Sequence, residues 1–503
     1  MFNSFYYPLN KIYMKRLIVF AAVLFFYSTV TAQIKDVHVS LEADGIGTTS
    51  GVVPFWFRSN QFGSMPLSGG SGSLIGSIRK DYDTTKTFDW AASFEGRANI
   101  GNYSRFDVIE GFVKGRAGIF ELKAGRSKDI VGLVDTALSS GAFSISGNAL
   151  GIPKVMLSIP DYYSIPIFGK LFAFKGSFAN GYAGNASVQY GSEPANFKTY
   201  YLENSLYVKV GKPSWRINFQ AGYNHEALWG DEKRVFGSHF NLSGWQTYWH
   251  VITGQVYAPA QSKVGNHLGS LDLGAEYKFN DFTLFLYSQS FYDKGALSSL
   301  ANIEDGLRGI SLTNNKRRSG NVYLKKILFE FLYTANQAGQ VDSKKTRSGA
   351  EDYYNNYEYL EGWSYKGVGL GTPFITPVSY ARDNLGKSKD QFFINNRVSA
   401  LHMAAQVYAF QWFYTGKLSF SQNMGTYETG TDPFRSVSVG NISVIRMPRN
   451  PGTFRKVNQL SAYLEGIRPL RNGYKVGYDV GFDHGELLYN SFGVILKVSK
   501  SFL

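Results

Sequence analysis

Residues 90 to 101 read WAASFEGRANIG, and this stretch predicts the fold. Trp90 and Phe94 fall on one face of an extended chain, whereas Glu95 and Arg97 fall on the other, because successive side chains of a β-strand point to opposite sides. The stretch therefore predicts a strand with one apolar, aromatic face and one charged face.

The same alternation recurs after residue 85 in residues 216–224, 271–279 and 475–483. Segments of about 9 to 12 residues with aromatic residues near their ends match strands that cross a bilayer, with lipid outside and a wet lumen inside. Lipid offers no partners to an open sheet edge, so such a sheet has to close. We predict an all-β fold, a closed antiparallel outer-membrane β-barrel of about 18 strands.

The end of the chain supports this prediction. Phe492, Val494 and Leu496 alternate with other residues, and the sequence ends Phe502-Leu503. A final strand that closes with an aromatic residue beside the terminus is typical of outer-membrane barrels.

Composition agrees with a single barrel domain. Gly (54), Tyr (34) and Phe (39) are abundant, and only 18% of the 503 residues are charged, which is typical of extended all-β membrane proteins. We find no linker, so residues 33–85, with the first strands, and residues 86–503 are predicted to form one domain. The absence of Cys excludes disulfides, Cys-ligated zinc and a lipoprotein anchor.

The first 32 residues predict a signal peptide. Lys11, Lys15 and Arg16 precede an apolar run, and small residues allow cleavage near Ala32. The run is shorter than the roughly 20 residues of a spanning helix, and no later apolar stretch reaches about 18 residues. The protein is therefore expected in the outer membrane, exposed at the cell surface.

Charge indicates the class of partner. Without the three cations of the signal peptide, 49 basic residues face 38 acidic ones, a net charge of +11. An exported basic protein favours anionic partners, here acidic capsular or exopolysaccharide and the phosphates of outer-membrane lipid and lipopolysaccharide. Export argues against nucleic acid, and a monomer fits the barrel.

Segments that break the alternation are rich in Gly, Pro and Asn, so we expect loops or lumen-filling pieces there. A short helix fits the sequence around residues 296–307. The predicted loops are residues 60–73, 139–169, 226–247, 338–390 and 421–456.

The sequence PFWFRSNQFG at residues 54–63 is the first candidate site. Aromatic faces beside an arginine and amides suit a hydroxyl-rich sugar, although a strand and turn at the membrane interface would have a similar composition. We expect Trp56 and Phe57 to pack structurally, and Arg58 and Asn60 to meet a carbohydrate.

A second candidate is YYNNYEYLEGWSYKGVGLGTPF at residues 353–374. Its tyrosines do not keep one strand register for long, which favours a loop or lumen surface over an aromatic girdle. The candidate carbohydrate-binding residues are Asn356, Tyr357, Trp363 and Tyr365.

The evidence for an enzyme is weaker. His225 and Trp229 flank Glu226 at a strand end, but a zinc protease would need a second histidine at position 229. On residue chemistry, we instead list His225 and Trp229 as candidate carbohydrate-binding residues. No GxSxG motif occurs. Paired acids such as Glu351 with Asp352, or Asp483 with Glu486, could serve a glycosidase but are more commonly exposed loop acids. We predict no catalytic residue, no metal and no cofactor.

Several of these stretches resemble the Wzi capsule assembly protein family. The resemblance rests on GVVPFWFRSNQFG, SSGAFSISGNALGIPKVMLSIPDYYSIPIFG, HEALWG, EDGLRGISL, EFLYTANQAG and YYNNYEYLEGWSYKGVGLGTPF, in chain order. It implies an 18-stranded outer-membrane barrel that acts as a non-enzymatic, lectin-like factor and attaches or organises surface polysaccharide. Residues 33–54 are too few for the periplasmic helical bundle of some members, so coupling to a secretion apparatus is not predicted.

Two alternatives stay open from the residues. One is a porin or polysaccharide export channel, in which lumen-facing Arg97, Arg216 and Lys278 would set a preference for anions. The other is a surface glycan hydrolase or deacylase.

Overall fold

The computed structural model describes residues 36–83, 85–102, 104–190, 193–237, 240–258, 262–316, 320–339, 351–387, 391–431, 437–439, 442–444 and 452–502. The predicted signal peptide, residues 1–32, lies outside the described residues. Among the described residues, no helix has the length and apolar character needed to span a membrane.

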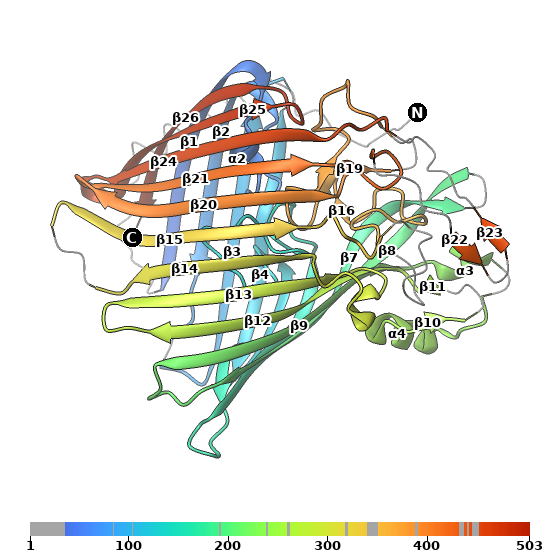
Figure 1. Ribbon diagram of the computed structural model, residues 1–503. Helices are drawn as coiled ribbons and strands as arrows, with labels where there is room; N and C mark the ends of the chain where they lie inside the picture. The colour runs from blue at the N-terminus through green and yellow to red at the C-terminus, as the bar shows by residue number, and fades with distance from the viewer. Residues whose placement is uncertain are drawn as a thin grey trace.

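Eighteen antiparallel strands form one closed sheet (Figure 1). Each long strand pairs with the next one along the chain, and β26 returns to pair with β1, where Phe502 lies opposite Val39. This closure confirms the predicted 18-stranded barrel. The strands are β1 (Val37–Val52), β2 (Ser68–Lys80), β3 (Phe88–Ile100), β4 (Arg105–Ala117), β5 (Phe120–Arg126), β6 (Lys154–Ser164), β7 (Phe172–Tyr190), β8 (Glu193–Val210), β9 (Ile217–Trp229), β12 (Asn266–Lys278), β13 (Phe282–Tyr292), β14 (Gly306–Asn314), β15 (Val322–Tyr333), β20 (Val398–Ala409), β21 (Trp412–Asn423), β24 (Val457–Pro469), β25 (Tyr474–Gly485) and β26 (Ser491–Phe502).

Short elements occupy the connections. The helices are α2 (Phe55–Arg58), α3 (Glu232–Val235), α4 (Gly244–Thr253), η2 (Ala296–Ser299) and η3 (Arg471–Gly473). The two-stranded pairs are β10 (Val256–Tyr257) with β11 (Ser262–Lys263), β16 (Ser364–Tyr365) with β17 (Val368–Gly369), β18 (Thr376–Pro377) with β19 (Phe393–Asn395), and β22 (Val437–Val439) with β23 (Ile442–Val444).

The alternation seen in the sequence separates the outside of the wall from the lumen. In β25, Phe482 is exposed on the outer side, whereas Asp479 and Asp483 are buried toward the lumen. In β3, Phe94 is exposed, whereas Arg97 is buried and forms an ion pair of 2.9 Å with a neighbouring carboxylate. Apolar outward and charged inward faces are those of a barrel in lipid.

The two ends of the barrel differ in their connections, as Figure 1 shows. At the short-turn end, which also holds Val37 and Phe502, residues 410–411 alone join β20 to β21, and residues 118–119 join β4 to β5. At the long-loop end, residues 127–153 join β5 to β6. The long connections of the barrel are therefore concentrated at one end.

Two predicted loops are wrong in part because strands enter them. β2 begins at Ser68, inside the predicted loop 60–73, since a run of Ser and Gly carries no apolar alternation to detect. β6 occupies residues 154–164 of the predicted loop 139–169, where Pro160 sits at an irregularity of the ladder between Ile159 and Tyr163 and disguised the strand.

Other predicted loops hold more regular structure than expected. β9 continues to Trp229, and α3 and α4 follow within or across residues 226–247. The predicted helix at residues 296–307 is only the turn η2, because Gly306 already begins β14 with φ of +159°. β21 extends to Asn423, into the predicted loop 421–456.

Candidate functional site

Parts of three connections from the long-loop end fold into the lumen, and together we call them the plug: residues 53–67, 127–153, and 351–387 with 391–397. They share one apolar cluster with inward-facing side chains of the wall. The aromatic plug members of this cluster are Phe55, Trp56, Phe143, Tyr353, Tyr354, Tyr359, Trp363, Tyr365, Phe374 and Phe393. The plug confirms the prediction that loops and short helices fill the lumen.

Carboxylates on the inner wall hold the plug by its backbone. Each accepts a hydrogen bond from a plug N–H group that would otherwise be buried without a partner, and hydrogen bonds to charged acceptors are the stronger ones. The pairs are Leu133 N with Asp272 at 2.7 Å, Ser140 N with Glu330 at 2.6 Å, and Phe55 N with Asp483 at 2.7 Å. These contacts come from three separate strands, so the plug is fixed on several sides.

Two acids that we expected to be exposed loop acids are buried, which corrects that prediction. Asp483 holds the plug, as described above. Glu351 is fully buried, and its carboxylate accepts hydrogen bonds from the backbone N–H groups of Asp293, Gly295 and Ala296 at the start of η2. Both acids support backbone, a role that local sequence cannot reveal because their partners are distant in the chain.

The PFWFRSNQFG motif lies within the plug. Trp56 and Phe57 are buried in α2, and the ammonium of Lys417 on the inner wall lies 4.6 Å from the Trp56 ring centroid. Arg58 is half-buried, with its guanidinium 3.9 Å from the Tyr380 ring centroid. Asn60 is half-buried and donates its side-chain amide to a plug carbonyl at 3.3 Å. The motif thus builds the plug, and its exposure to a ligand is small.

The second candidate stretch divides between the plug and the surface. Trp363 has no exposed surface and donates its indole N–H to the Ser144 carbonyl at 2.8 Å. Asn356 caps the next turn, because its side-chain oxygen accepts from two backbone N–H groups. Tyr357 is 64% exposed, whereas Tyr365 is buried and its hydroxyl accepts from Arg126 at 3.2 Å. The structure brings Trp56, Trp363 and Tyr365 into one cluster.

His225 and Trp229 lie elsewhere, on the outer side of the wall beneath residues 240–258, which we call the outer cover. His225 is buried, with its Nε2 3.2 Å from Nδ1 of His267 and its Nδ1 3.1 Å from the Tyr292 hydroxyl. The Trp229 ring packs beside that of Tyr248 on α4. The outer cover therefore keeps these two residues apart from the other candidates.

The wall has a gap at its long-loop end, which we call the notch. β5 pairs with β4 only up to Gly111, and β6 pairs with β7 only up to Gly181. Residues 105–110 of β4 and 182–190 of β7 therefore have no strand between them, although each pairs normally on its other side. The chain leaves the wall at the end of β5 to form the plug, which is what opens the notch.

The plug, together with Arg126 at the end of β5, fills the notch and supplies hydrogen-bond partners to its two edges. Leu360 donates its backbone N–H to the Ser187 carbonyl at 2.9 Å, beside an antiparallel bridge between Val188 and Tyr359. Arg126 donates to the Val108 carbonyl of β4 at 2.7 Å. Backbone groups at a sheet edge need partners, and the plug and Arg126 supply them at these positions.

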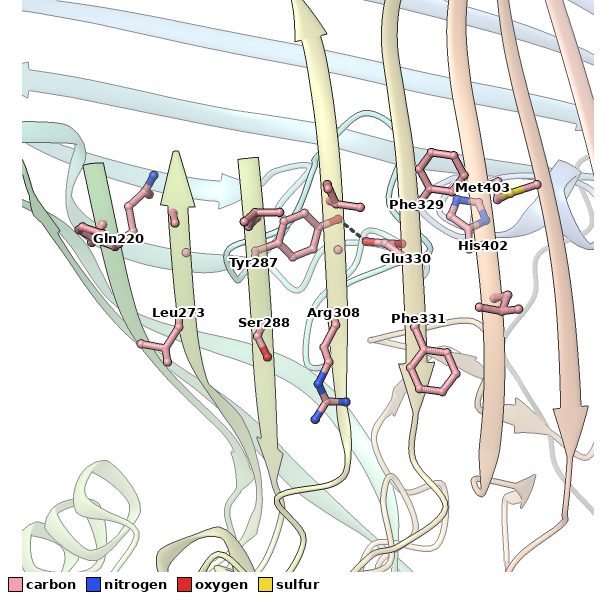
Figure 2. Close-up of a pocket in the computed structure, with 17 residues that line it drawn as sticks. Gln220, Leu273, Tyr287, Ser288, Arg308, Phe329, Glu330, Phe331, His402 and Met403 are labelled. Carbon is pink, nitrogen blue, oxygen red and sulfur yellow. Dashed lines mark hydrogen bonds between the residues drawn. The ribbon is translucent and has the colours of Figure 1, made fainter. Parts of the chain in front are cut away.

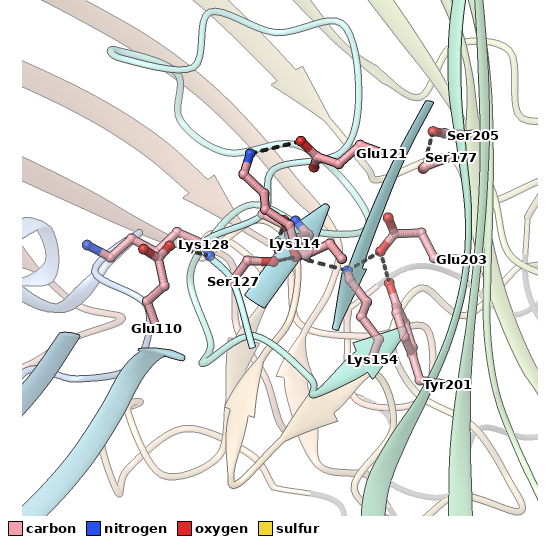
Figure 3. A network of polar contacts seen from close by, with 12 residues as sticks. Glu110, Lys114, Glu121, Ser127, Lys128, Lys154, Ser177, Tyr201, Glu203 and Ser205 are labelled. Atoms are coloured by element: carbon pink, nitrogen blue, oxygen red, sulfur yellow. Dashed lines mark hydrogen bonds and ion pairs between the residues drawn. The ribbon is translucent and has the colours of Figure 1, made fainter. Parts of the chain in front are cut away.

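A charged network ties the plug to the inner wall (Figure 3). The Lys154 ammonium on β6 lies 2.6 Å from a Glu203 oxygen and 3.0 Å from an Asp129 oxygen of the plug. Burial favours the neutral form of Asp129, but Lys154 and Lys123 outweigh it and hold the pKa of Asp129 below its ordinary value. Sequence reasoning missed this network because its members lie on separate strands.

Two cavities accompany the plug and the wall. A polar cavity of about 250 Å³ lies between them, lined among others by Asn60, Asp135 and Lys417. A larger hollow of about 840 Å³ lies mainly against the outward apolar side chains of β9 to β20, including Leu273 and Phe329 (Figure 2). In a membrane barrel this outer hollow faces acyl chains, so it is not a site for a hydrophilic ligand.

No group of three or more His, Cys, Asp or Glu side chains suited to a metal ion occurs within the part of the chain that the structure describes. The two adjacent histidines under the outer cover use their ring nitrogens on each other, on Tyr292 and on backbone carbonyls. They act there as packing residues.

Comparison with known proteins gives a family match. The model of the family described as "Capsule assembly protein Wzi" matches residues 76–376, more than half of the chain. No curated protein sequence matches the chain.

Several solved structures are similar to this chain. Acinetobacter baumannii OccAB2 shares 12% identity, with 93% of this chain and 98% of that chain covered and a TM-score of 0.43. Pseudomonas aeruginosa OpdL shares 10% identity, with 93% and 98% covered and a TM-score of 0.43. Pseudomonas aeruginosa OccK3 (OpdO) shares 9% identity, with 93% and 96% covered and a TM-score of 0.41.

Proposed function

Because the chain belongs to the Wzi capsule assembly protein family, we propose that it is a non-catalytic, lectin-like protein of the outer membrane. In this proposal it binds exported acidic polysaccharide at the cell surface and helps to attach or organise it there. The long-loop end faces outward, since outer-membrane barrels place short turns on the periplasmic side and long loops outside.

The observation that carries this proposal is the plug. A barrel that transports solute needs a continuous wet lumen, whereas here segments from three connections share one apolar cluster inside the wall. Wall carboxylates on β12, β15 and β25 hold plug backbone groups inside the lumen. A filled barrel favours a fixed platform over a channel.

The surface of that platform suits a polysaccharide. Tyr357 is largely exposed at the long-loop end, and Arg382 and Tyr489 lie together there, with the guanidinium 5.7 Å from the ring centroid. Exposed rings offer stacking to a sugar chain, and the half-buried Arg382 adds positive charge beside them. The net positive charge of the mature chain acts in the same direction.

The test is retention of surface polysaccharide purified from cells that express the protein. Purified protein in liposomes should retain the polysaccharide in co-sedimentation, and Tyr357→Ala should weaken retention while leaving heat-modifiable migration on gels unchanged. Absence of retention by the unaltered protein would overturn the proposal.

The channel alternative is tested on the same preparation. Planar-bilayer recordings should show little conductance, because the plug obstructs the lumen. A large, stable, ohmic conductance would favour a porin or export channel and would contradict the platform. Product release from the polysaccharide would point to the hydrolase or deacylase alternative.

A further inference from the structure

The notch holds a group of cations that the described residues do not neutralise fully. Arg105 begins β4, Arg126 ends β5, and Lys366 occupies the turn between β16 and β17 of the plug. All three act on one carboxylate, Asp107, and Arg126 and Lys366 also lie beside the Tyr365 ring. We call these five residues the notch cluster.

The cluster is held in place by several contacts. The Arg126 guanidinium donates to the Tyr365 hydroxyl at 3.2 Å and to the β4 backbone at 2.7 Å. Arg105 pairs with Asp107 at 2.6 Å and donates to the Gly63 carbonyl of the plug at 2.9 Å. The two arginines are therefore oriented before any ligand arrives, which reduces the entropy that binding costs.

The positive charges exceed the negative charge. Asp107 already pairs with Arg105, and the described residues give neither Arg126 nor Lys366 an ion pair. The Arg126 Nε is buried and has no hydrogen-bond partner in the described part of the chain. Partial desolvation lowers the pKa of Lys366, and repulsion from Arg126 and Arg105 lowers it further, against an opposing effect of Asp107. An anion placed among these groups would relieve the repulsion.

The cluster is open to a ligand on one side. Lys366 is exposed, and the Arg105 side chain is 36% exposed, whereas Tyr365 and Asp107 are buried behind them. The Lys366 ammonium lies 5.7 Å from the Tyr365 ring centroid and makes no hydrogen bond within the described residues. An incoming group would therefore meet ammonium and guanidinium donors first.

We propose that the notch cluster binds the carboxylate of an acidic saccharide unit, with Lys366 and Arg105 as the contacting cations and Arg126 and Tyr365 as positioning residues. A carboxylate suits this arrangement because it accepts several charge-assisted hydrogen bonds at once. The inference rests on the proposed function and names the site that binds the acidic group of the sugar. It also places recognition at the point where the plug meets the wall.

The choice of test variants follows from the backbone conformation at Lys366. Lys366 has φ of +52°, a left-handed conformation that asparagine tolerates better than most residues, so Lys366→Asn removes the charge with little strain. The matched control is Lys387→Asn, which removes one positive charge from a loop at the same end, where Lys387 pairs with Asp383. Lys366→Glu reverses the charge.

The measurement is calorimetric titration of the full-length protein in nanodiscs with oligogalacturonate, and with neutral maltooligosaccharide as the uncharged probe. We expect Lys366→Asn to raise the Kd for oligogalacturonate by about tenfold and Lys366→Glu by more, with Lys387→Asn within about twofold of the unaltered protein. Maltooligosaccharide should not distinguish the variants.

Two titration results would overturn the inference. One is an unchanged Kd in both Lys366 variants, and the other is a lack of oligogalacturonate binding by the unaltered protein. These outcomes are separate from failure of the proposed function, which is judged by retention of the cell's own polysaccharide. Retention that survives in Lys366→Glu would keep the function and exclude the notch.

Discussion

The plug and the outer cover are two aromatic-rich parts of the long-loop end, and they lie on opposite sides of one wall. In the plug, Trp363 is fully buried and its indole N–H is bonded. In the outer cover, Trp245 and Trp249 on α4 are 68% and 48% exposed. Aromatic residues thus form a buried core inside the barrel and an exposed surface outside it, and the side of the wall determines which of the two they form.

The difference follows from what each side of the wall offers. Inward faces carry carboxylates and amides that satisfy a folded loop, so a segment can be buried there with its polar groups paired. Outward faces are apolar, and α4 buries Thr247 and Val251 against them while its tryptophans point away. Exposed tryptophans at this level are typical of the membrane interface.

The largest expected effect is on plug packing. Trp363→Ala should lower the free energy of unfolding by about 4 kcal/mol, because it removes a large buried ring and leaves the Ser144 carbonyl unpaired. Guanidinium-induced unfolding in liposomes measures this change. A loss below about 1 kcal/mol would mean that the ring is not a structural part of the plug.

The next effect is on the link between the plug and the wall. Lys154→Met should cost about 3 kcal/mol, since the buried Glu203 would lose its cation and Asp129 would keep only Lys123. Lys209→Met is the control, because Lys209 lies on the neighbouring inner wall at 4.7 Å from the Tyr162 ring centroid and has no ion pair among the described residues. Equal losses in the two variants would contradict the special role of Lys154.

The stability of the plug should depend on pH through Glu358. Burial raises the pKa of Glu358 from 4.5 to about 7, with a smaller contribution from Glu232. A raised carboxyl pKa means that the folded state holds its proton where the unfolded state has lost it, so stability falls as pH rises from about 4.5 to 7.

Glu358→Gln should therefore remove about 2 kcal/mol of the stability difference between pH 5 and pH 8. Unfolding curves of the unaltered protein and of Glu358→Gln, each at pH 5 and pH 8, give the free energies of unfolding that measure this difference. An identical pH dependence in the variant would show that Glu358 does not stay neutral in the plug.

The smallest expected effect is in the outer cover. Trp249→Cys should change the free energy of unfolding by less than about 0.5 kcal/mol, because the ring is half-exposed. The chain has no other cysteine, so an environment-sensitive dye on this residue reports its surroundings. We expect an apolar, interfacial emission in liposomes. Water-like emission would place α4 away from the membrane.

Much of the wall could be predicted from the sequence, and little of the plug could. The strands at residues 90–101 and 475–483 alternate clearly, whereas β2 is hidden in Ser and Gly and β6 is interrupted at Pro160. Of the candidate site residues, Trp56, Trp363 and Tyr365 come together in the plug, while His225 and Trp229 lie under the outer cover. Their roles in carbohydrate binding stay predictions.

The notch cluster was missed because no local pattern marks it. Arg105 and Arg126 are ordinary strand-end cations, and Lys366 lies in a turn 240 residues later than Arg126. Only the early end of β5 and the return of the plug bring the three together. A Tyr-Lys-Gly turn in an aromatic stretch was the one available signal.

The sequence by itself determined the barrel, because the two-residue period that separates lipid from lumen is written into each strand and closure follows from the lack of partners in lipid. The tertiary structure alone decided which long connection folds inward, which folds outward, and where the wall opens. Those outcomes depend on partners such as Asp272, Glu330 and Asp483, which lie far along the chain from the N–H groups that they hold.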